Sequence, residues 1–366
     1  SEDSKNINSK SYRRLVFDEI CANFITLSEN RKIVKRNKKK KLFREGISKK
    51  IINNLNFELT GDQLKVLKEI NSDLKSNKRM FRIMQGDVGS GKTIVSMLSL
   101  ANVIESNYQC ALMGPTEILA YQHFKLALKI FNNNFKIEFL SGKTETRKRK
   151  EILRKLKEGK IDLLIGTHAL FQKKIEFKKL GYVVIDEQHK FGVKQRSDFA
   201  KKGGINCDVL LMSATPIPRT MMMSHYGDMD VSKITEKPSA RKKITTLSKP
   251  EKKINELWNF LNKQIAEKNQ IFWVCPLIEE SKFLDFSSAK KKFDLINNKF
   301  PNKVGLIHGS LGKEEKEKVL KRFLEKKISI LVSTTVIEVG IDFPNANVII
   351  IENANKFGLA QLHQLR

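Results

Sequence analysis

The chain has 366 residues, 40% of them hydrophobic, and carries 69 lysines and arginines against 40 acidic residues, a formal net charge of +29. This length can form two domains, each with its own core, and the apolar content is typical of a soluble globular protein. No stretch reaches the roughly 18 uninterrupted apolar residues of a membrane helix, and the polar N-terminal residues lack the apolar region of a secretory signal. The composition therefore argues against membrane-spanning and secreted classes, and we expect a cytoplasmic protein.

The positive charge indicates a polyanionic partner, of which nucleic acid is the usual one. Lysine greatly outnumbers arginine, so a genome-wide lysine bias is an alternative explanation of the same charge. The four cysteines lie far apart and form no C-x-x-C pair, which favours reduced thiols over a disulfide or a structural zinc. They are Cys21, Cys110, Cys207 and Cys275.

Residues 1–54 are lysine-rich and mostly polar. Apolar residues at helical spacing predict an amphipathic helix over Tyr12–Leu27. The following run, Arg31–Arg44, is strongly basic, which fits a solvated helix face or loop and, alternatively, a contact to a phosphate backbone. We expect this region to be a helical basic linker.

From Phe57 onward, predicted strands and helices alternate, which is the pattern of an α/β fold with a parallel sheet. Helices are expected over Thr93–Glu105 and Ile118–Ile130. The predicted strands of this first region are Phe81–Met84, Cys110–Met113, Ile137–Leu140, Asp162–Ile165, Tyr182–Ile185 and Val209–Met212.

A charged, proline-containing stretch at Thr235–Lys243 interrupts this pattern and predicts a hinge. The alternation then resumes, with an amphipathic helix over Lys313–Leu324. The strands predicted there are Ile271–Val274, Val304–Ile307, Ile328–Val332 and Val348–Ile351. The sequence thus predicts two tandem α/β lobes with a cleft that opens and closes with nucleotide state.

The first lobe contains the spacing G-x-x-x-x-G-K-[ST] between a predicted strand and a predicted helix. In such a loop the backbone N–H groups and the helix N-terminus surround a phosphate. Lys92 is expected to reach the β- and γ-phosphates, and the Thr93 hydroxyl to bind Mg²⁺. The loop comprises Gly86, Asp87, Val88, Gly89, Ser90, Gly91, Lys92 and Thr93.

Two adjacent carboxylates, Asp186 and Glu187, follow the apolar run Tyr182–Ile185, at the end of a strand where open α/β sheets bind ligands. Asp186 is expected to hold the metal, and Glu187 to orient and deprotonate the attacking water. His189 is either a packing residue or a coupling residue. Gln63, about twenty residues before the loop, is expected to bind the adenine edge. We therefore expect ATP and Mg²⁺ as cofactors.

Further short segments make the chain from Phe57 to Arg366 resemble the superfamily 2 helicases. Gly114–Ala120 looks like motif Ia, Leu140–Gly142 like Ib, Gly166–Leu170 like Ic, and Ser213–Pro216 like III. In the second lobe, three more segments resemble motifs IVa, V and the start of VI. These are Ile307–Gly309, Ser333–Asp342 and Gln361–Arg366.

The resemblance implies two RecA-like lobes, at residues 55–234 and 246–366, joined by a hinge at 235–245 and preceded by the linker at 1–54. It also implies roles for individual positions. Gly340, Asp342, Gln364 and Arg366 would complete the ATP site from the second lobe. Coupling would involve His189, Ser213, Ala214 and Thr215. The residues expected to contact DNA are Pro115, Thr116, Gly142, Thr167, His168 and Thr334.

Within the superfamily, three phrases are most similar to the RecG family of branched-DNA helicases: Gly86–Thr93, Asp186–Val193 and Phe357–Arg366. Transcription-repair coupling factors are similar but typically have Phe where Ser90 stands, and replication-restart helicases differ further around the loop. The RecG resemblance implies a wedge domain before residue 1 and more of motif VI after Arg366. We therefore interpret the sequence as an internal piece, with an incomplete second lobe and impaired activity of its own.

The function this implies is an ATP-dependent DNA helicase or translocase that migrates Holliday junctions and regresses stalled forks in DNA repair and recombination. The implied partner is branched double-stranded DNA, with single-stranded DNA-binding protein as a further partner, and the implied state is a monomer associated with the bacterial nucleoid. Two alternatives remain open. One is a translocase of transcription-coupled repair or replication restart, and the other is a nucleotide-gated DNA-binding module with little turnover.

Overall fold

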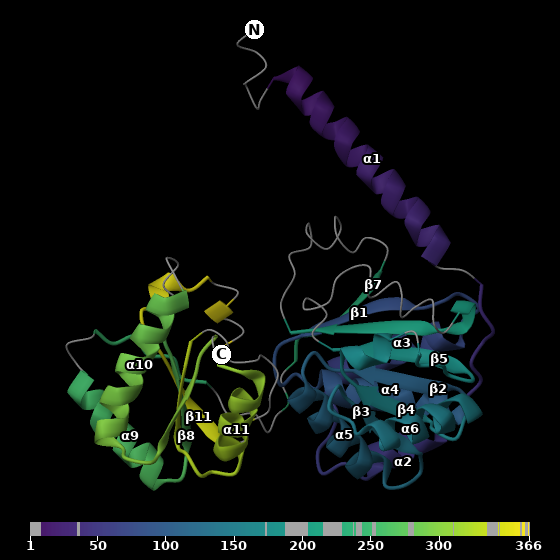
Figure 1. Ribbon diagram of the computed structural model, residues 1–366. Helices are drawn as coiled ribbons and strands as arrows, with labels where there is room; N and C mark the ends of the chain where they lie inside the picture. The colour runs from purple at the N-terminus through teal and green to yellow at the C-terminus, as the bar shows by residue number, and fades with distance from the viewer. Residues whose placement is uncertain are drawn as a thin grey trace. The chain divides into compact units, whose positions relative to one another are not determined.

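In the computed structural model, the chain divides into two compact units, residues 1–241 and 242–366. The division falls within residues 235–245. The residues that the structure describes are 9–34, 37–186 except 173, 204–214, 229–250 except 237 and 239–243, 254–276, 282–309, 311–334, 343–362 except 344, 359 and 360, and 365. Each unit is described by itself below (Figure 1).

The first unit is built on a seven-stranded sheet in the order β3-β4-β2-β5-β6-β1-β7, with every neighbouring pair parallel. The six predicted strands of this lobe are all present. A seventh, β7, was missed by the prediction and lies at the edge beside β1. The strands are β1 (Phe81–Gly86), β2 (Gln109–Met113), β3 (Ile137–Leu140), β4 (Leu163–Gly166), β5 (Leu180–Ile185), β6 (Asp208–Ser213) and β7 (Asp230–Ile234).

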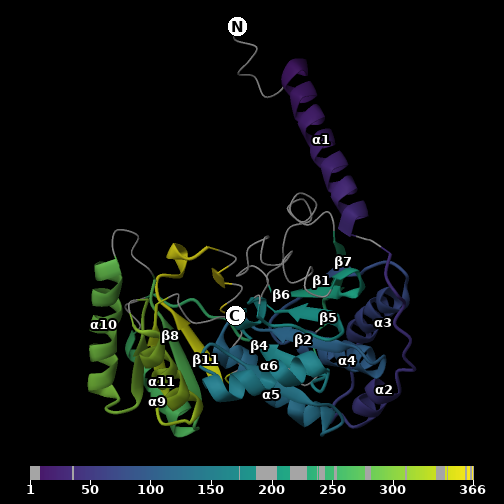
Figure 2. The ribbon, with the colours of Figure 1, turned by 45° about the vertical axis from the view of Figure 1, so that its right-hand side comes forward.

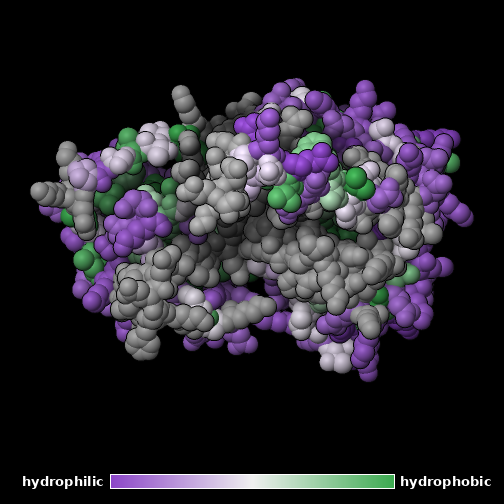
Figure 3. Space-filling view, turned by 90° about the horizontal axis from the view of Figure 1, so that it is seen from above, coloured by the Kyte–Doolittle hydropathy of each residue, from purple (hydrophilic) through white to green (hydrophobic). Residues whose placement is uncertain are grey.

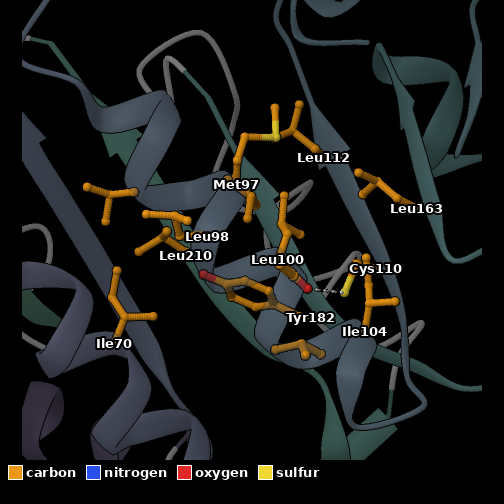
Figure 4. Close-up of a cluster of buried hydrophobic side chains, with 14 of the residues drawn as sticks. Ile70, Met97, Leu98, Leu100, Ile104, Cys110, Leu112, Leu163, Tyr182 and Leu210 are labelled. Carbon is orange, nitrogen blue, oxygen red and sulfur yellow. Dashed lines mark hydrogen bonds between the residues drawn. The ribbon is translucent and has the colours of Figure 1, made fainter. Parts of the chain in front are cut away.

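Both faces of this sheet are buried, which explains why its central strands are continuous apolar runs in the sequence. Successive side chains of a strand point to opposite faces. In β5, Tyr182 and Val184 join one cluster, whereas Val183 and Ile185 join the other. Figure 4 shows part of the first cluster, where Tyr182 lies among apolar side chains from α3, α4 and the neighbouring strands.

Helices cover the two faces. The first cluster includes residues of α2, α3, α4 and α5, and the second includes those of α6. Their bounds are α2 (Gly46–Asn53), α3 (Gly61–Lys75), α4 (Lys92–Glu105), α5 (Glu117–Phe131) and α6 (Thr146–Glu158). Two short 3-10 helices, η2 (His168–Phe171) and η4 (Gly204–Asn206), lie between strands. The long helix α1 (Lys10–Val34) covers the predicted Tyr12–Leu27, and almost all its described side chains are exposed.

Part of the basic run Arg31–Arg44 is buried in the first unit. Lys38 and Lys41, whose side chains are fully buried, both form ion pairs with the Asp208 carboxylate at the start of β6. The second carboxylate oxygen of Asp208 accepts the backbone N–H of Met80, which precedes β1. The expectation of a solvated or phosphate-binding surface is therefore wrong for these two lysines, which instead fasten this segment to the base of the sheet.

The second unit contains a four-stranded parallel sheet in the order β11-β8-β10-β9. Its strands are β8 (Gln270–Val274), β9 (Val304–Ile307), β10 (Ile330–Ser333) and β11 (Ala346–Ile351). The helices α9 (Ile254–Ala266), α10 (Lys282–Lys299) and α11 (Lys313–Leu324) pack around it, and η6 (Ala354–Lys356) follows (Figure 2). In the core of this unit, Trp258 of α9 stacks on Trp273 of β8, with their ring centroids 5.6 Å apart. The predicted α/β fold with two parallel-sheet lobes is confirmed.

Hydrophilic side chains dominate the described surface in the view of Figure 3, where hydrophobic groups are small and scattered. Within the described part of the chain, no helix combines the length and apolar character needed to cross a membrane.

Candidate nucleotide and DNA site

The site residues of the first unit gather at one edge of its sheet. In a parallel sheet all strands end at the same edge, and β5, β6 and β1 are consecutive neighbours. Asp186 therefore follows β5, Ser213 ends β6 with Ala214 just after it, and the phosphate loop follows β1, all at the carboxyl edge where open α/β sheets bind ligands. The order of the strands therefore places the ends of these three segments next to one another.

The phosphate loop contains two glycines with positive φ, Gly89 at 76° and Gly91 at 86°. Gly91 is the N-cap of α4, so the loop leads directly into a helix N-terminus that favours an anion. The ammonium group of Lys92, the first residue of the helix, donates to the carbonyls of Gly86 at 2.6 Å and Asp87 at 2.8 Å. The Lys92 side chain thus contacts the loop itself, and its ammonium group would have to give up these two carbonyls to reach a bound phosphate.

Two further observations describe how closely the loop is packed. The Ser90 hydroxyl is 1% exposed and has no hydrogen-bond partner among the described residues. A buried polar atom of this kind calls for a partner. A Cβ added at Gly91 would stand 2.2 Å from the Gln63 side-chain amide, so the cradle accepts only glycine there without rearrangement.

Gln63 has a different set of contacts from the one expected. Its side-chain oxygen accepts from the Thr60 N–H at 3.0 Å, which with the Thr60 hydroxyl forms a capping box at the start of α3. Its side-chain nitrogen donates to the Ser90 carbonyl at 2.8 Å. The side chain is 1% exposed. Gln63 therefore holds the phosphate loop, and its contact with adenine stays a prediction.

Asp186 is buried, and its carboxylate lies 2.8 Å from Nε2 of His123, whose side chain is buried as well. The Asp186 N–H donates to the carbonyl of Met113, the last residue of β2. His123 belongs to α5 and was missed by the prediction, because one histidine within an amphipathic helix has no distinguishing local signal. Its contact with the expected metal ligand is visible only in the fold.

The segments expected to contact DNA are joined to one another. Thr116 caps α5, its hydroxyl accepting from the Leu119 N–H. Glu117 in the first turn of α5 accepts from the Ser141 hydroxyl at 2.8 Å, next to the exposed Gly142. The Gly114 N–H donates to the Gly166 carbonyl, one residue before Thr167. Motifs Ia, Ib and Ic therefore lie together at the carboxyl edge.

Pro115, Thr116 and Thr167 are half-buried, a position from which backbone and hydroxyl groups can reach a ligand. For His168 the structure describes the backbone, at the start of η2. Other expected residues lie outside the described residues. They are Glu187, His189, Thr215, Gly340, Asp342, Gln364 and Arg366.

In the second unit, His308 follows β9 and Thr334 follows β10, so both occupy the carboxyl edge of that sheet. The Thr334 N–H donates to the Ile307 carbonyl, and its side chain is buried. Burial, reinforced by the nearby Lys316, lowers the pKa of His308, which favours a neutral imidazole at neutral pH. The DNA contact expected of Thr334 stays a prediction.

The comparisons with known proteins agree with this geometry. The DEAD/DEAH box helicase family matches residues 60–224, and the helicase conserved C-terminal domain matches residues 252–366. The chain is 45% identical over 368 residues to the ATP-dependent DNA helicase RecG of Thermotoga maritima, covering 98% of this chain and 46% of that protein. With RecG of Bacillus subtilis the identity is 46% over 320 residues, or 87% of this chain and 47% of the relative.

A solved structure of RecG bound to a three-way DNA junction superimposes with a TM-score of 0.84 at 41% identity, covering 96% of this chain and 47% of that one. The chain belongs to the RecG helicase family. The resemblance predicted from its motifs is thereby confirmed, and the matched helicase domains imply that it binds nucleotide. The chain spans about half the length of the curated RecG relatives that it matches.

Proposed function

We propose that this chain is the motor of an ATP-dependent DNA helicase that acts on branched DNA in repair and recombination. The observation that carries the proposal is a phosphate loop and a buried acidic residue, Asp186, at one sheet edge, in a chain 41% identical to a RecG that was solved on a three-way DNA junction. In this proposal the motor drives Holliday junction migration and fork regression.

The residues present fit a magnesium nucleotide. Lys92 would exchange the Gly86 and Asp87 carbonyls for the β- and γ-phosphates, while loop N–H groups and the α4 N-terminus hold the phosphate oxygens. Thr93 and Asp186 would hold Mg²⁺, which when bound neutralises phosphate charge. Glu187 is proposed to orient the attacking water.

DNA contact is proposed for the joined motifs Ia, Ib and Ic. Glycine and small hydroxyl residues such as Thr116, Gly142 and Thr167 allow close approach to phosphates, and contacts of that kind carry no sequence information. Recognition would then depend on DNA shape. The net charge of +29 supports a strong electrostatic component, which predicts that affinity falls with salt at a log–log slope of roughly −0.9 per phosphate contact.

Gly142 offers a direct test of this surface. It is exposed, and a Cβ added there would meet no atom within 4 Å. Gly142→Ala should therefore unfold at the wild-type temperature yet bind a fluorescent three-way junction roughly 2- to 12-fold more weakly, the equivalent of one lost hydrogen bond. Unchanged affinity would remove motif Ib from the proposed interface.

The function itself is tested in the full-length protein by ATP hydrolysis measured with and without a three-way DNA junction, using wild type, Lys92→Ala and Glu187→Ala. The proposal expects DNA-stimulated hydrolysis that both substitutions abolish. Nucleotide-dependent DNA affinity without stimulation would favour the alternative, a nucleotide-gated binding module. Preference for a stalled transcription complex over a junction would favour a transcription-repair translocase.

We further propose that the protein acts as a monomer. We also propose that it works in the bacterial cytoplasm at the nucleoid, a location supported by its bacterial relatives and by the motifs proposed to contact DNA. Binding to single-stranded DNA-binding protein is proposed from the same resemblance. Sedimentation of the chain with and without a junction tests the monomer, and a pull-down with that purified partner tests the interaction.

A further inference from the structure

The contact between His123 and Asp186 belongs to no motif used above. Nε2 of His123 and a carboxylate oxygen of Asp186 are 2.8 Å apart, and both side chains are at most one-tenth exposed. An ionised carboxylate only accepts hydrogen bonds, so the tautomer of His123 that carries its proton on Nε2 is the one that bonds to ionised Asp186. In this low-dielectric setting, such a charge-assisted bond is stronger than a neutral one and fixes the plane of the carboxylate.

Asp186 is held from two directions. Its backbone N–H is bonded to the Met113 carbonyl at the end of β2, and its side chain is bonded to His123 two turns into α5. The backbone bond places Asp186 at the sheet edge and leaves its side-chain torsion undetermined. The hydrogen bond from His123 acts on the carboxylate itself and restricts that torsion.

α5 is a suitable support for this bond. The helix is fixed at its start by the Thr116 cap and by the Glu117–Ser141 hydrogen bond, and farther along by Ala127 and Phe131 in the core. A donor on a packed helix holds its acceptor more firmly than one on a loop.

We propose that His123 is a positioning residue of the nucleotide site, which turns the Asp186 carboxylate into the orientation that binds Mg²⁺. The inference rests on the proposed function, since it concerns the metal of the nucleotide complex. When a partner that orients a metal-binding carboxylate is replaced, metal affinity or activity typically falls 10- to 100-fold.

The test compares three substitutions in the full chain. His123→Ala removes the donor. His123→Gln can bring an amide N–H close to the position of Nε2, whereas His123→Asn is too short to do so. If His123→Ala does not fold, the comparison of Gln with Asn carries the test, because both place an amide at the same buried position. Lys129→Ala, exposed on the same helix, serves as the control.

The readout is the binding of a fluorescent, non-hydrolysable ATP analogue, titrated with Mg²⁺ and repeated in EDTA. We expect His123→Ala and His123→Asn to need about 10- to 100-fold more Mg²⁺ than wild type, with unchanged binding in EDTA. His123→Gln and Lys129→Ala should titrate close to wild type. Wild-type Mg²⁺ dependence in both His123→Ala and His123→Asn would overturn the inference alone. No nucleotide binding by the wild type would overturn the proposed function, and the inference with it.

Discussion

The side-chain amide of Gln63 donates to the backbone carbonyl of Ser90 across 2.8 Å, and both residues are 1% exposed. This bond joins the first turn of α3 to the phosphate loop. Because the other end of the same amide belongs to the α3 capping box, one side chain serves both helix stability and loop shape.

A substitution of Thr60, the partner of Gln63 in the capping box, can separate the two roles of Gln63. Gln63→Ala removes both, leaving the buried Ser90 carbonyl without this donor, at a cost of about 1–3 kcal/mol. Thr60→Ala removes only the hydrogen bond that the Thr60 hydroxyl accepts in the capping box, which should lower stability by about 1 kcal/mol. We expect both variants to lose stability in urea, and only Gln63→Ala to bind a fluorescent ATP analogue about tenfold more weakly. Equal nucleotide affinity in the two variants would refute the role of Gln63 in the loop.

Gly91→Ala should affect nucleotide binding through the same contact. Its φ of 86° disfavours a side chain by about 1–2 kcal/mol, and the new Cβ would displace the Gln63 amide. Gly159, with φ of 80° at the C-terminus of α6, provides a control with the same backbone penalty. Both alanine variants should melt at lower temperature. Only Gly91→Ala should bind nucleotide at least tenfold more weakly, as measured by equilibrium titration, and a similar loss in Gly159→Ala would show a global effect.

Asp208 balances two fully buried lysines, so its replacement should be among the most damaging in the first unit. Asp208→Asn leaves Lys38 and Lys41 without their carboxylate, and breaking a buried pair in this way costs about 3–5 kcal/mol. Glu176→Gln breaks the exposed Lys157–Glu176 pair, which solvent screens, and should change stability far less. Urea unfolding measures both. Similar small losses would mean that the buried pairs contribute little.

Lys38 also predicts a pH dependence. Burial lowers its pKa from 10.5 to about 8, although the Asp208 carboxylate opposes the shift. Between these two values the unfolded chain binds a proton that the folded chain does not, so this group makes stability rise with pH from about 8 to 10.5. Below pH 8 it contributes no slope.

Urea unfolding from pH 7 to 10 measures this slope, with Lys38→Met as the reference because groups outside the Lys38–Lys41–Asp208 cluster titrate alike in both proteins. The stability of wild type relative to Lys38→Met should increase above pH 8. A difference that stays constant or decreases would contradict the lowered pKa of Lys38.

Strands buried on both faces were predictable because each is a continuous apolar run, as in Tyr182–Ile185. The phosphate loop was predictable because its chemistry requires fixed local spacing. The edge strand β7 was missed, since Asp230–Ile234 has a single neighbour in the sheet and includes the exposed Lys233. Such a short, mixed segment has no local signal that distinguishes it from a loop.

Contacts between distant parts of the chain were beyond prediction from local patterns. Lys38 and Asp208 are 170 residues apart, so the sequence shows a basic run and an isolated acid without their pairing. His123 and Asp186 are 63 residues apart and meet because α5, which packs on β3 and β4, brings His123 next to the residue that follows β5. Both contacts depend on the order of the strands, which local periodicity does not determine.

The lysine anchor stands at the foot of β6, whereas Ser213 stands at the head of the same strand, beside the phosphate loop. The two ion pairs therefore hold the segment that begins at Asn37 at the opposite edge of the sheet from the phosphate loop.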